Sequence, residues 1–119
     1  MKLQGKAKLL RIYTGDSDKV NGKCLYECIV EEARGCELAG ATVYRGIMSF
    51  GASHSIHTMR IFALSGDLPV VIEIIDEEAK IRSFIPLAEE LMDKSKKGGL
   101  IFVEDVEVIR YVKGEKYKL

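Results

Sequence analysis

The feature that most constrains the fold is an apolar repeat in the second half of the chain. Hydrophobic side chains recur there every three or four residues: Ile81, Phe84, Ile85, Ala88, Leu91 and Met92. This spacing predicts an α-helix, because residues three and four apart lie on the same side of a helix. We expect Asp76 or Glu77 to begin it, and Pro86 to bend it because the proline ring removes one backbone hydrogen bond.

A second helical pattern lies nearer the N-terminus, from Val20 to Arg34. Its apolar positions also have helical spacing: Leu25, Ile29 and Ala33. Asp18 or Asn21 is predicted to begin this helix and Gly35 to end it, because such residues are common at helix termini. The chain therefore carries two amphipathic helices, separated by residues of a different character.

Strand-like segments surround both helical patterns. β-Branched and aromatic residues mark four segments: 6–13, 41–50, 69–75 and 100–112. We expect a break in the last segment at Glu104-Asp105 and a short extension of strand at 59–64. The resulting order, β-α-β-β-α-β, predicts a ferredoxin-like α+β fold in which two helices cover one face of a four-stranded antiparallel sheet. One such domain is expected over residues 1–119.

The composition argues against several classes of protein. The 18 basic and 18 acidic residues balance, so no overall field attracts nucleic acid or an anionic membrane. No apolar stretch is long enough for a membrane span, and the first residues lack a signal segment, which favours a cytoplasmic location. The three cysteines fit a reducing compartment, and Cys24 and Cys28 are interpreted as small core residues.

A glycine pair just before the last strand-like segment is the first candidate for a binding site. Gly98-Gly99 precedes the apolar run Ile101–Val103, and Arg110 follows further along. Glycines let backbone N–H groups approach an anion closely, and an arginine at the end of a strand adds positive charge. The pair can equally be a helix C-cap followed by a turn.

Several residues around the 51–58 loop are further candidates. Gly46 is interpreted either as a bulge or as a point where another backbone or a ligand comes close. Arg45 and Arg60 flank the loop and either form surface ion pairs or contribute charge to a site. His54 and His57 have a spacing that allows metal binding, but no carboxylate or cysteine lies close in sequence, so we favour a hydrogen-bonding or phosphate-facing role for His57.

Together these segments resemble the PII signalling proteins. In that family a glycine-rich turn, an Ile-Phe-Val strand and an Arg-x-x-x-Gly-Glu tail hold an adenine nucleotide; the matching segments here are Gly98–Val103 and Arg110–Glu115. The Gly-Phe-Gly that enters the long PII loop falls on Ser49–Gly51. Over nearly its whole length the chain is similar to a PII-like branch with three characteristic segments, which are Arg45-Gly46, Phe50–Ser53 and Ile56–Thr58.

The resemblance implies a homotrimer that binds an adenine nucleotide, AMP or ADP, in clefts between subunits. With the candidates named above, the predicted nucleotide-binding residues are Arg45, Gly46, Ser49, Phe50, Gly51, His57, Arg60, Lys97, Gly98, Gly99, Leu100, Ile101, Phe102 and Arg110. The loop Gly51–Thr58 is expected to regulate a partner protein, a membrane transporter being one candidate. Four apolar side chains are expected on the uncovered face of the sheet, where a trimer would bury them: Val43, Ile47, Val106 and Val108. No catalytic residue, metal ligand, cofactor or nucleic-acid partner is expected.

The sequence also departs from the PII pattern. Leu100 stands where PII proteins have a lysine that holds phosphates, and Val112 stands at their second C-terminal arginine. No tyrosine lies between Tyr44 and Tyr111, so control by uridylylation in the loop is unsupported. Two alternatives stay open, namely a metal-tolerance protein of the CutA kind and a small-molecule-binding enzyme that uses the same cleft.

Overall fold

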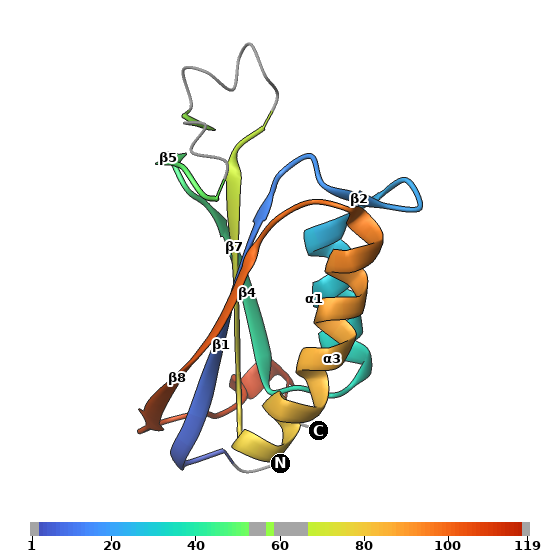
Figure 1. Ribbon diagram of the computed structural model, residues 1–119. Helices are drawn as coiled ribbons and strands as arrows, with labels where there is room; N and C mark the ends of the chain where they lie inside the picture. Colours follow the sequence, from blue (N-terminus) through green and yellow to red (C-terminus); the bar gives the residue numbers. More distant parts are fainter. Residues whose placement is uncertain (1–2, 53–56, 59–66, 118–119) are drawn as a thin grey trace.

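The computed structural model describes residues 3–52, 57–58 and 67–117. Its centre is a four-stranded antiparallel sheet with the strand order β4-β7-β1-β8. The strands span Gly5–Gly15 (β1), Gly40–Arg45 (β4), Pro69–Asp76 (β7) and Leu100–Val108 (β8). Helices α1 (Leu25–Gly35) and α3 (Glu78–Ser95) lie side by side on one face of the sheet (Figure 1). The predicted ferredoxin-like α+β fold is confirmed.

The hydrophobic core lies between the sheet and the two helices. Alternate residues of the central strands β1 and β7 point toward the helices because side chains alternate along a strand: Leu10, Ile12, Ile72 and Ile74. The apolar sides of the helices meet them with the predicted residues: Leu25, Ile29, Ala33, Ile81, Phe84 and Ala88. Glu77 is the N-cap of α3, as expected, and α3 continues through Pro86.

The start of the first helix was predicted too early. Residues 19–24 form a hairpin, in which β2 (Lys19–Val20) pairs with β3 (Lys23–Cys24), and α1 begins only at Leu25. The turn residues Asn21 and Gly22 have φ angles of 50° and 81°. Positive φ at both central residues is the geometry of a type I′ turn, for which Asn-Gly is a preferred sequence. The Asn-Gly pair therefore forms a turn, and the helix begins after it, at the first residue of the apolar spacing, Leu25.

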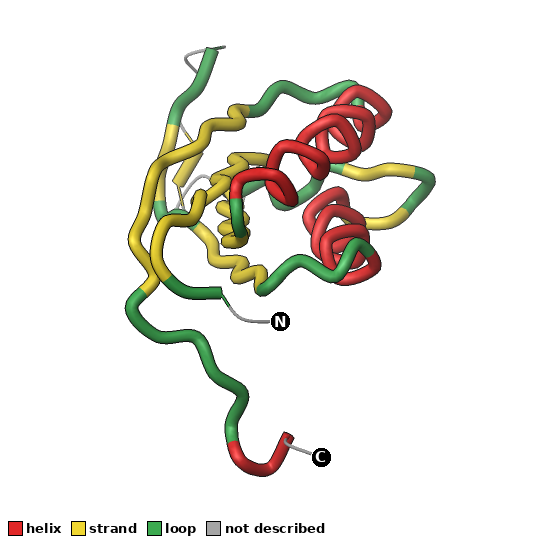
Figure 2. The backbone as a smooth tube through the Cα atoms, turned by 90° about the horizontal axis from the view of Figure 1, so that it is seen from below, coloured by secondary structure: helices red, strands yellow, loops and turns green. Residues whose placement is uncertain are grey.

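The predicted break at Glu104-Asp105 was also wrong, because β8 runs unbroken from Leu100 to Val108. Both carboxylates form ion pairs with the neighbouring strand: Lys8 with Asp105, and Arg11 Nη1 with Glu104 Oε1 at 2.5 Å. The strand then ends earlier than predicted. Residues 109–112 belong to a tail that extends away from the sheet to a short 3₁₀ helix, η1 (Glu115–Tyr117), as Figure 2 shows.

The predicted strand 41–50 is interrupted at Gly46. β4 ends at Arg45, and β5 (Met48–Ser49) pairs with β6 (His57–Thr58) in a separate two-stranded ribbon. The Gly46 N–H donates to Pro69 O at 2.9 Å, and a Cβ on Gly46 would lie 2.9 Å from Pro69 Cγ. Gly46 is therefore a point of close approach, and the neighbour is Pro69 of the same chain. The expected strand extension at 59–64 lies outside the described residues.

Candidate functional site

The turn between α3 and β8 is where the predicted glycine pair lies. Lys96, with φ 60°, is the C-cap of α3, so the helix ends before the glycines. A Cβ on Gly99 would lie 2.7 Å from the backbone oxygen of Tyr13 and would also clash with Met92. A Cβ on Gly98 would meet no atom within 4 Å. The two glycines therefore differ: Gly99 allows the turn to pack on β1, and Gly98 leaves open space beside it.

We predict that Gly99→Ala destabilises the fold and that Gly98→Ala does not. The added methyl group of Gly99→Ala has to displace the backbone of β1, which should cost about 1–3 kcal/mol of the free energy of unfolding. Gly98→Ala is the matched control, one residue away in the same turn, and its unfolding midpoint should stay near that of the wild type. Urea denaturation measures both values. Equal midpoints for the two variants would contradict the close approach to Tyr13.

A cavity of about 400 Å³ adjoins this turn. Six residues from α3, the turn and the start of β8 line it: Glu89, Met92, Asp93, Lys97, Gly99 and Ile101. Three of them, Lys97, Gly99 and Ile101, were predicted site residues. The carboxylates Glu89 and Asp93 were not predicted, because on the sequence they look like ordinary exposed residues of an amphipathic helix.

Arg45 is held by a carboxylate of its own chain. Its guanidinium donates to Asp16 Oδ1 at 3.1 Å and to Asp16 Oδ2 at 3.2 Å, and this pairing raises the pKa of Arg45. The Asp16 backbone N–H in turn donates to Leu68 O at 2.7 Å. Of the two predicted arginines beside the loop, Arg45 is thus already paired, and Arg60 lies outside the described residues.

Asp18 is a buried carboxylate at the same end of the sheet, and sequence reasoning missed its role. The Gly15 N–H donates to its Oδ2 at 2.9 Å. Its Oδ1 and the Oδ1 of Asp67 both lie 2.8 Å from the position that a Cβ on Gly15 would take, so two carboxylates lie close together beside Gly15. Burial raises the pKa of Asp18, and Asp67 raises it further, whereas the Gly15 hydrogen bond and the charge of Lys97 act in the opposite direction.

Because the folded-state pKa of Asp18 is raised, the ionised carboxylate should cost stability at neutral pH. Asn keeps an oxygen that can accept from Gly15, so Asp18→Asn should raise the melting temperature at pH 7. As the pH falls, the wild-type carboxylate takes up its proton in the folded state first, and the difference between the two proteins should vanish. Thermal unfolding of both proteins from about pH 7 to about pH 3 measures this. A variant less stable at pH 7 would contradict it.

The remaining predicted residues are distributed along β8 and the ribbon. Ile101 packs against the core, whereas Phe102 points to the opposite face, where it lies 5.4 Å beneath the Arg11 guanidinium. Neighbouring strand residues face opposite ways, so these two side chains cannot line one surface of a ligand. Phe50 and Leu100 are exposed at 63% and 52%. Ser49 and His57 are paired across the β5–β6 ribbon, at whose end Gly51 lies exposed.

Arg110 lies far from the other candidate residues. β8 pairs with β1 from Leu100 opposite Tyr13 to Val108 opposite Gly5, so Arg110 follows the far end of the strand. At about 3.3 Å per residue, the strand separates the glycine turn from Val108 by roughly 26 Å. The tail is further attached at that end by the Tyr111 hydroxyl, which donates to Ala39 O. Within one chain, Arg110 therefore does not join Lys97.

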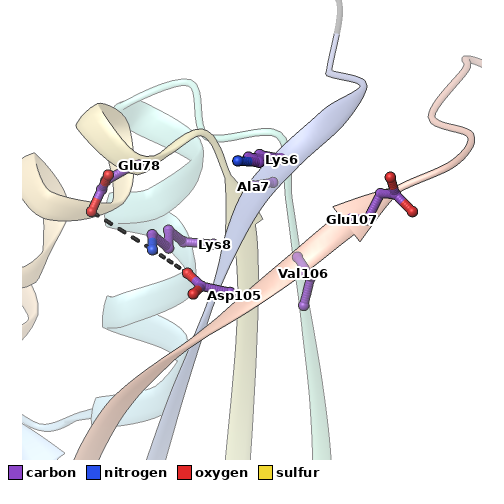
Figure 3. A pocket seen from close by; sticks show the side chains of 7 residues that line it. All are labelled: Lys6, Ala7, Lys8, Glu78, Asp105, Val106 and Glu107. Carbon is purple, nitrogen blue, oxygen red and sulfur yellow. Dashed lines mark hydrogen bonds and ion pairs between the residues drawn. The ribbon is translucent and has the colours of Figure 1, made fainter.

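A second cavity, of about 410 Å³, lies toward that far end, beside the start of β1 and the first turn of α3 (Figure 3). Its walls carry two lysines and three carboxylates, and the residues that line it are Lys6, Ala7, Lys8, Glu78, Asp105, Val106 and Glu107. The Lys8 ammonium lies between Glu78, at 3.7 Å, and Asp105, whose pKa it lowers through a hydrogen bond. Both ion pairs of Lys8 are therefore formed within its own chain.

Two further observations bear on the expected function. Within the described ranges, no three His, Cys, Asp or Glu side chains are grouped so that they could hold a metal ion. In the same ranges, no helix is long and apolar enough to cross a membrane. The three cysteines form no disulfide. Cys28 packs against the core as predicted, but Cys24 is only partly buried and accepts a hydrogen bond from Lys19, and Cys36 is exposed.

Solved structures share this fold of a four-stranded sheet with two helices on one face. The structure of CPII, a nitrogen regulatory PII-like protein from Thiomonas intermedia K12 bound to ADP, AMP and bicarbonate, matches with a TM-score of 0.67 at 17% identity. The match covers 88% of this chain and 90% of that one. A PII-like signaling protein from Thermus thermophilus matches with a TM-score of 0.55 at 19% identity, over 93% of this chain and 100% of that one.

The family is shown by sequence. Residues 7–108 match the model of DUF190, described as "Uncharacterized ACR, COG1993". A UPF0166 protein of Aquifex aeolicus (strain VF5) is 47% identical over 104 residues, which is 87% of this chain and 94% of that relative. The chain belongs to the DUF190 (UPF0166) family, and its fold is PII-like.

Proposed function

We propose that this protein is a non-enzymatic, cytoplasmic sensor that binds AMP or ADP between copies of the chain. The observation that carries the proposal is the separation of the two candidate phosphate-binding cations. Lys97 lines the cavity at the glycine turn, and Arg110 follows the opposite end of β8. A site that uses both needs a second copy of the chain, in the manner of a ring in which each subunit contacts the next.

The proposed ligand is an adenine nucleotide with few phosphates. The structural neighbour CPII was solved with ADP and AMP, which supports this class of ligand. In the PII pattern a lysine and two arginines bind the phosphates, and this chain has Leu100 and Val112 at two of those positions. Each missing charge-assisted hydrogen bond should cost about 1.5–3 kcal/mol, or about tenfold or more in affinity. ATP should lose most, because its additional phosphates have the fewest partners.

The loop Gly51–Thr58 is the proposed contact with a regulated partner. It follows β5, and β5 in turn follows Arg45 and Gly46 along the chain. A ligand bound at this end of the sheet would stabilise one arrangement of the loop, and a partner that prefers this arrangement would then bind more tightly. Capture experiments with and without nucleotide would identify the partner, which is a membrane transporter or another protein.

A thermal-shift screen followed by calorimetry tests the ligand. The screen should include adenosine, AMP, ADP, ATP and divalent metals, because a ligand that binds the native state raises its melting temperature. We expect stabilisation by AMP and ADP, less by ATP, and none by metals alone. Stabilisation by metals only would favour the CutA-like alternative. Turnover of the nucleotide in the presence of magnesium would favour an enzyme.

A further inference from the structure

The cavity beside the glycine turn has more negative than positive charge in its wall. Lys97 contributes a cation, whereas Glu89 and Asp93 contribute two carboxylates from successive turns of α3. All three side chains belong to exposed residues, so an incoming phosphate would meet the carboxylates directly. The two carboxylates therefore oppose the attraction that Lys97 exerts on a phosphate.

Arg45, on the edge strand opposite to β8, is also held by an acidic group of its own chain. Asp16 holds Arg45 through two hydrogen bonds, so that guanidinium is not free to turn toward a phosphate without losing both. Asp18 and Asp67 lie close together beside Gly15. The glycine turn packs directly on this part of β1, since Gly99 lies against the Tyr13 oxygen. The charge of Lys97 also lowers the pKa of Asp18, against the larger effect of burial, which raises it.

We propose that Glu89 and Asp93 are specificity-determining residues, which limit the site to adenine ligands of low negative charge by repelling additional phosphates. This inference rests on the proposed function and deepens it. Among the described residues of the cavity wall Lys97 is the single cation, so each additional phosphate adds charge that the wall does not neutralise, and affinity should fall from ADP to ATP. The effect should weaken at high salt, because the carboxylates are exposed and are screened by ions.

The test compares charge-neutralising variants with a matched control. Asp93→Asn and Glu89→Gln, combined in one protein, keep the size of the side chains and remove both carboxylates from the wall. Glu90→Gln removes one charge from the same helix, but Glu90 is not part of the wall and pairs with Lys94 at 3.2 Å. Calorimetry with adenosine, AMP, ADP and ATP at low salt gives the affinities. Adenosine carries no charge, so it reports any change in shape or folding.

We expect the double variant to bind ATP about three- to tenfold more tightly, relative to adenosine, than the wild type does. Glu90→Gln should leave this ratio within about twofold, since its charge is already paired and lies away from the cavity. An unchanged ratio in the double variant would overturn the inference and leave the proposed function standing. If neither adenosine nor any nucleotide binds to the wild type, the proposed function fails and the inference falls with it.

Discussion

Light scattering after size exclusion should give a mass three times that of the 13.3 kDa chain. The helices cover only one face of the sheet, and the other face lies open (Figure 1). By strand register, this open face carries many apolar side chains: Leu9, Tyr13, Tyr44, Ile75, Leu100, Phe102 and Val106. Tyr44 and Leu100 are exposed at 45% and 52% in the single chain. A monomeric protein rarely leaves so large an apolar surface to water.

The charges on the open face are already paired, so it can be buried at moderate cost. Arg11 Nε donates to Glu73 Oε2 at 2.9 Å, and its Nη1 lies 2.5 Å from Glu104 Oε1. The Tyr44 hydroxyl also donates to Glu73, at 2.9 Å. Ionic groups whose hydrogen bonds are satisfied within the network lose less on desolvation than isolated charges. Val43, in contrast, was wrongly expected on this face, because it pairs with the buried Ile72 on the helix-covered side.

A single charge on the open face should disrupt the assembly. Phe102→Glu places a carboxylate opposite Arg11, whose guanidinium is already held by two other carboxylates. The new charge would therefore be buried in the assembly without a partner of its own, and the light-scattering mass should shift toward the monomer. Ser83→Glu adds the same charge at an exposed position of α3 and serves as the control. A wild-type protein that stays monomeric at micromolar concentration would refute both the trimer and a site shared between subunits.

Lys97→Ala and Arg110→Ala should each weaken AMP and ADP binding at least tenfold, and a mixture of the two variants should partly recover it. Each substitution removes one charge-assisted hydrogen bond to phosphate, worth about 1.5–3 kcal/mol. Because the two side chains lie at opposite ends of β8, a shared site takes Lys97 from one subunit and Arg110 from the next. In randomly mixed trimers, about a quarter of such sites contain both native residues.

Co-expression of the two variants with different affinity tags yields the mixed assembly, and calorimetry then counts the sites of native affinity. Each variant alone, purified in the same way, is the control for residual binding. Recovery only in the mixture would require the two residues to act from different subunits. If the mixture binds no better than the separate variants, Arg110 does not contribute to the site of a neighbouring subunit.

Much of this fold is determined by local patterns that any reader of the sequence can find. The helical spacing from Ile81 to Met92 places one side of α3 on the core, and the apolar run after Pro69 produces the central strand β7. Asn21-Gly22 determines the hairpin before α1 just as directly, although the helix was predicted to begin at or before this pair. These signals are readable because they depend on residues a few positions apart, whose geometry the backbone alone sets.

The environment of each candidate side chain was decided only by tertiary contacts. Gly99 and Tyr13 are far apart in sequence, yet the backbone oxygen of Tyr13 takes the space beside Gly99. The capture of Arg45 by Asp16 and the two carboxylates in the cavity wall depend in the same way on distant segments meeting. The periodicity of apolar residues predicts which face of a helix or strand a residue occupies, but it does not predict which residue of another segment contacts it. The separation of Lys97 from Arg110 by the length of β8 follows from strand register, and it is the reason that the proposed site requires a second chain.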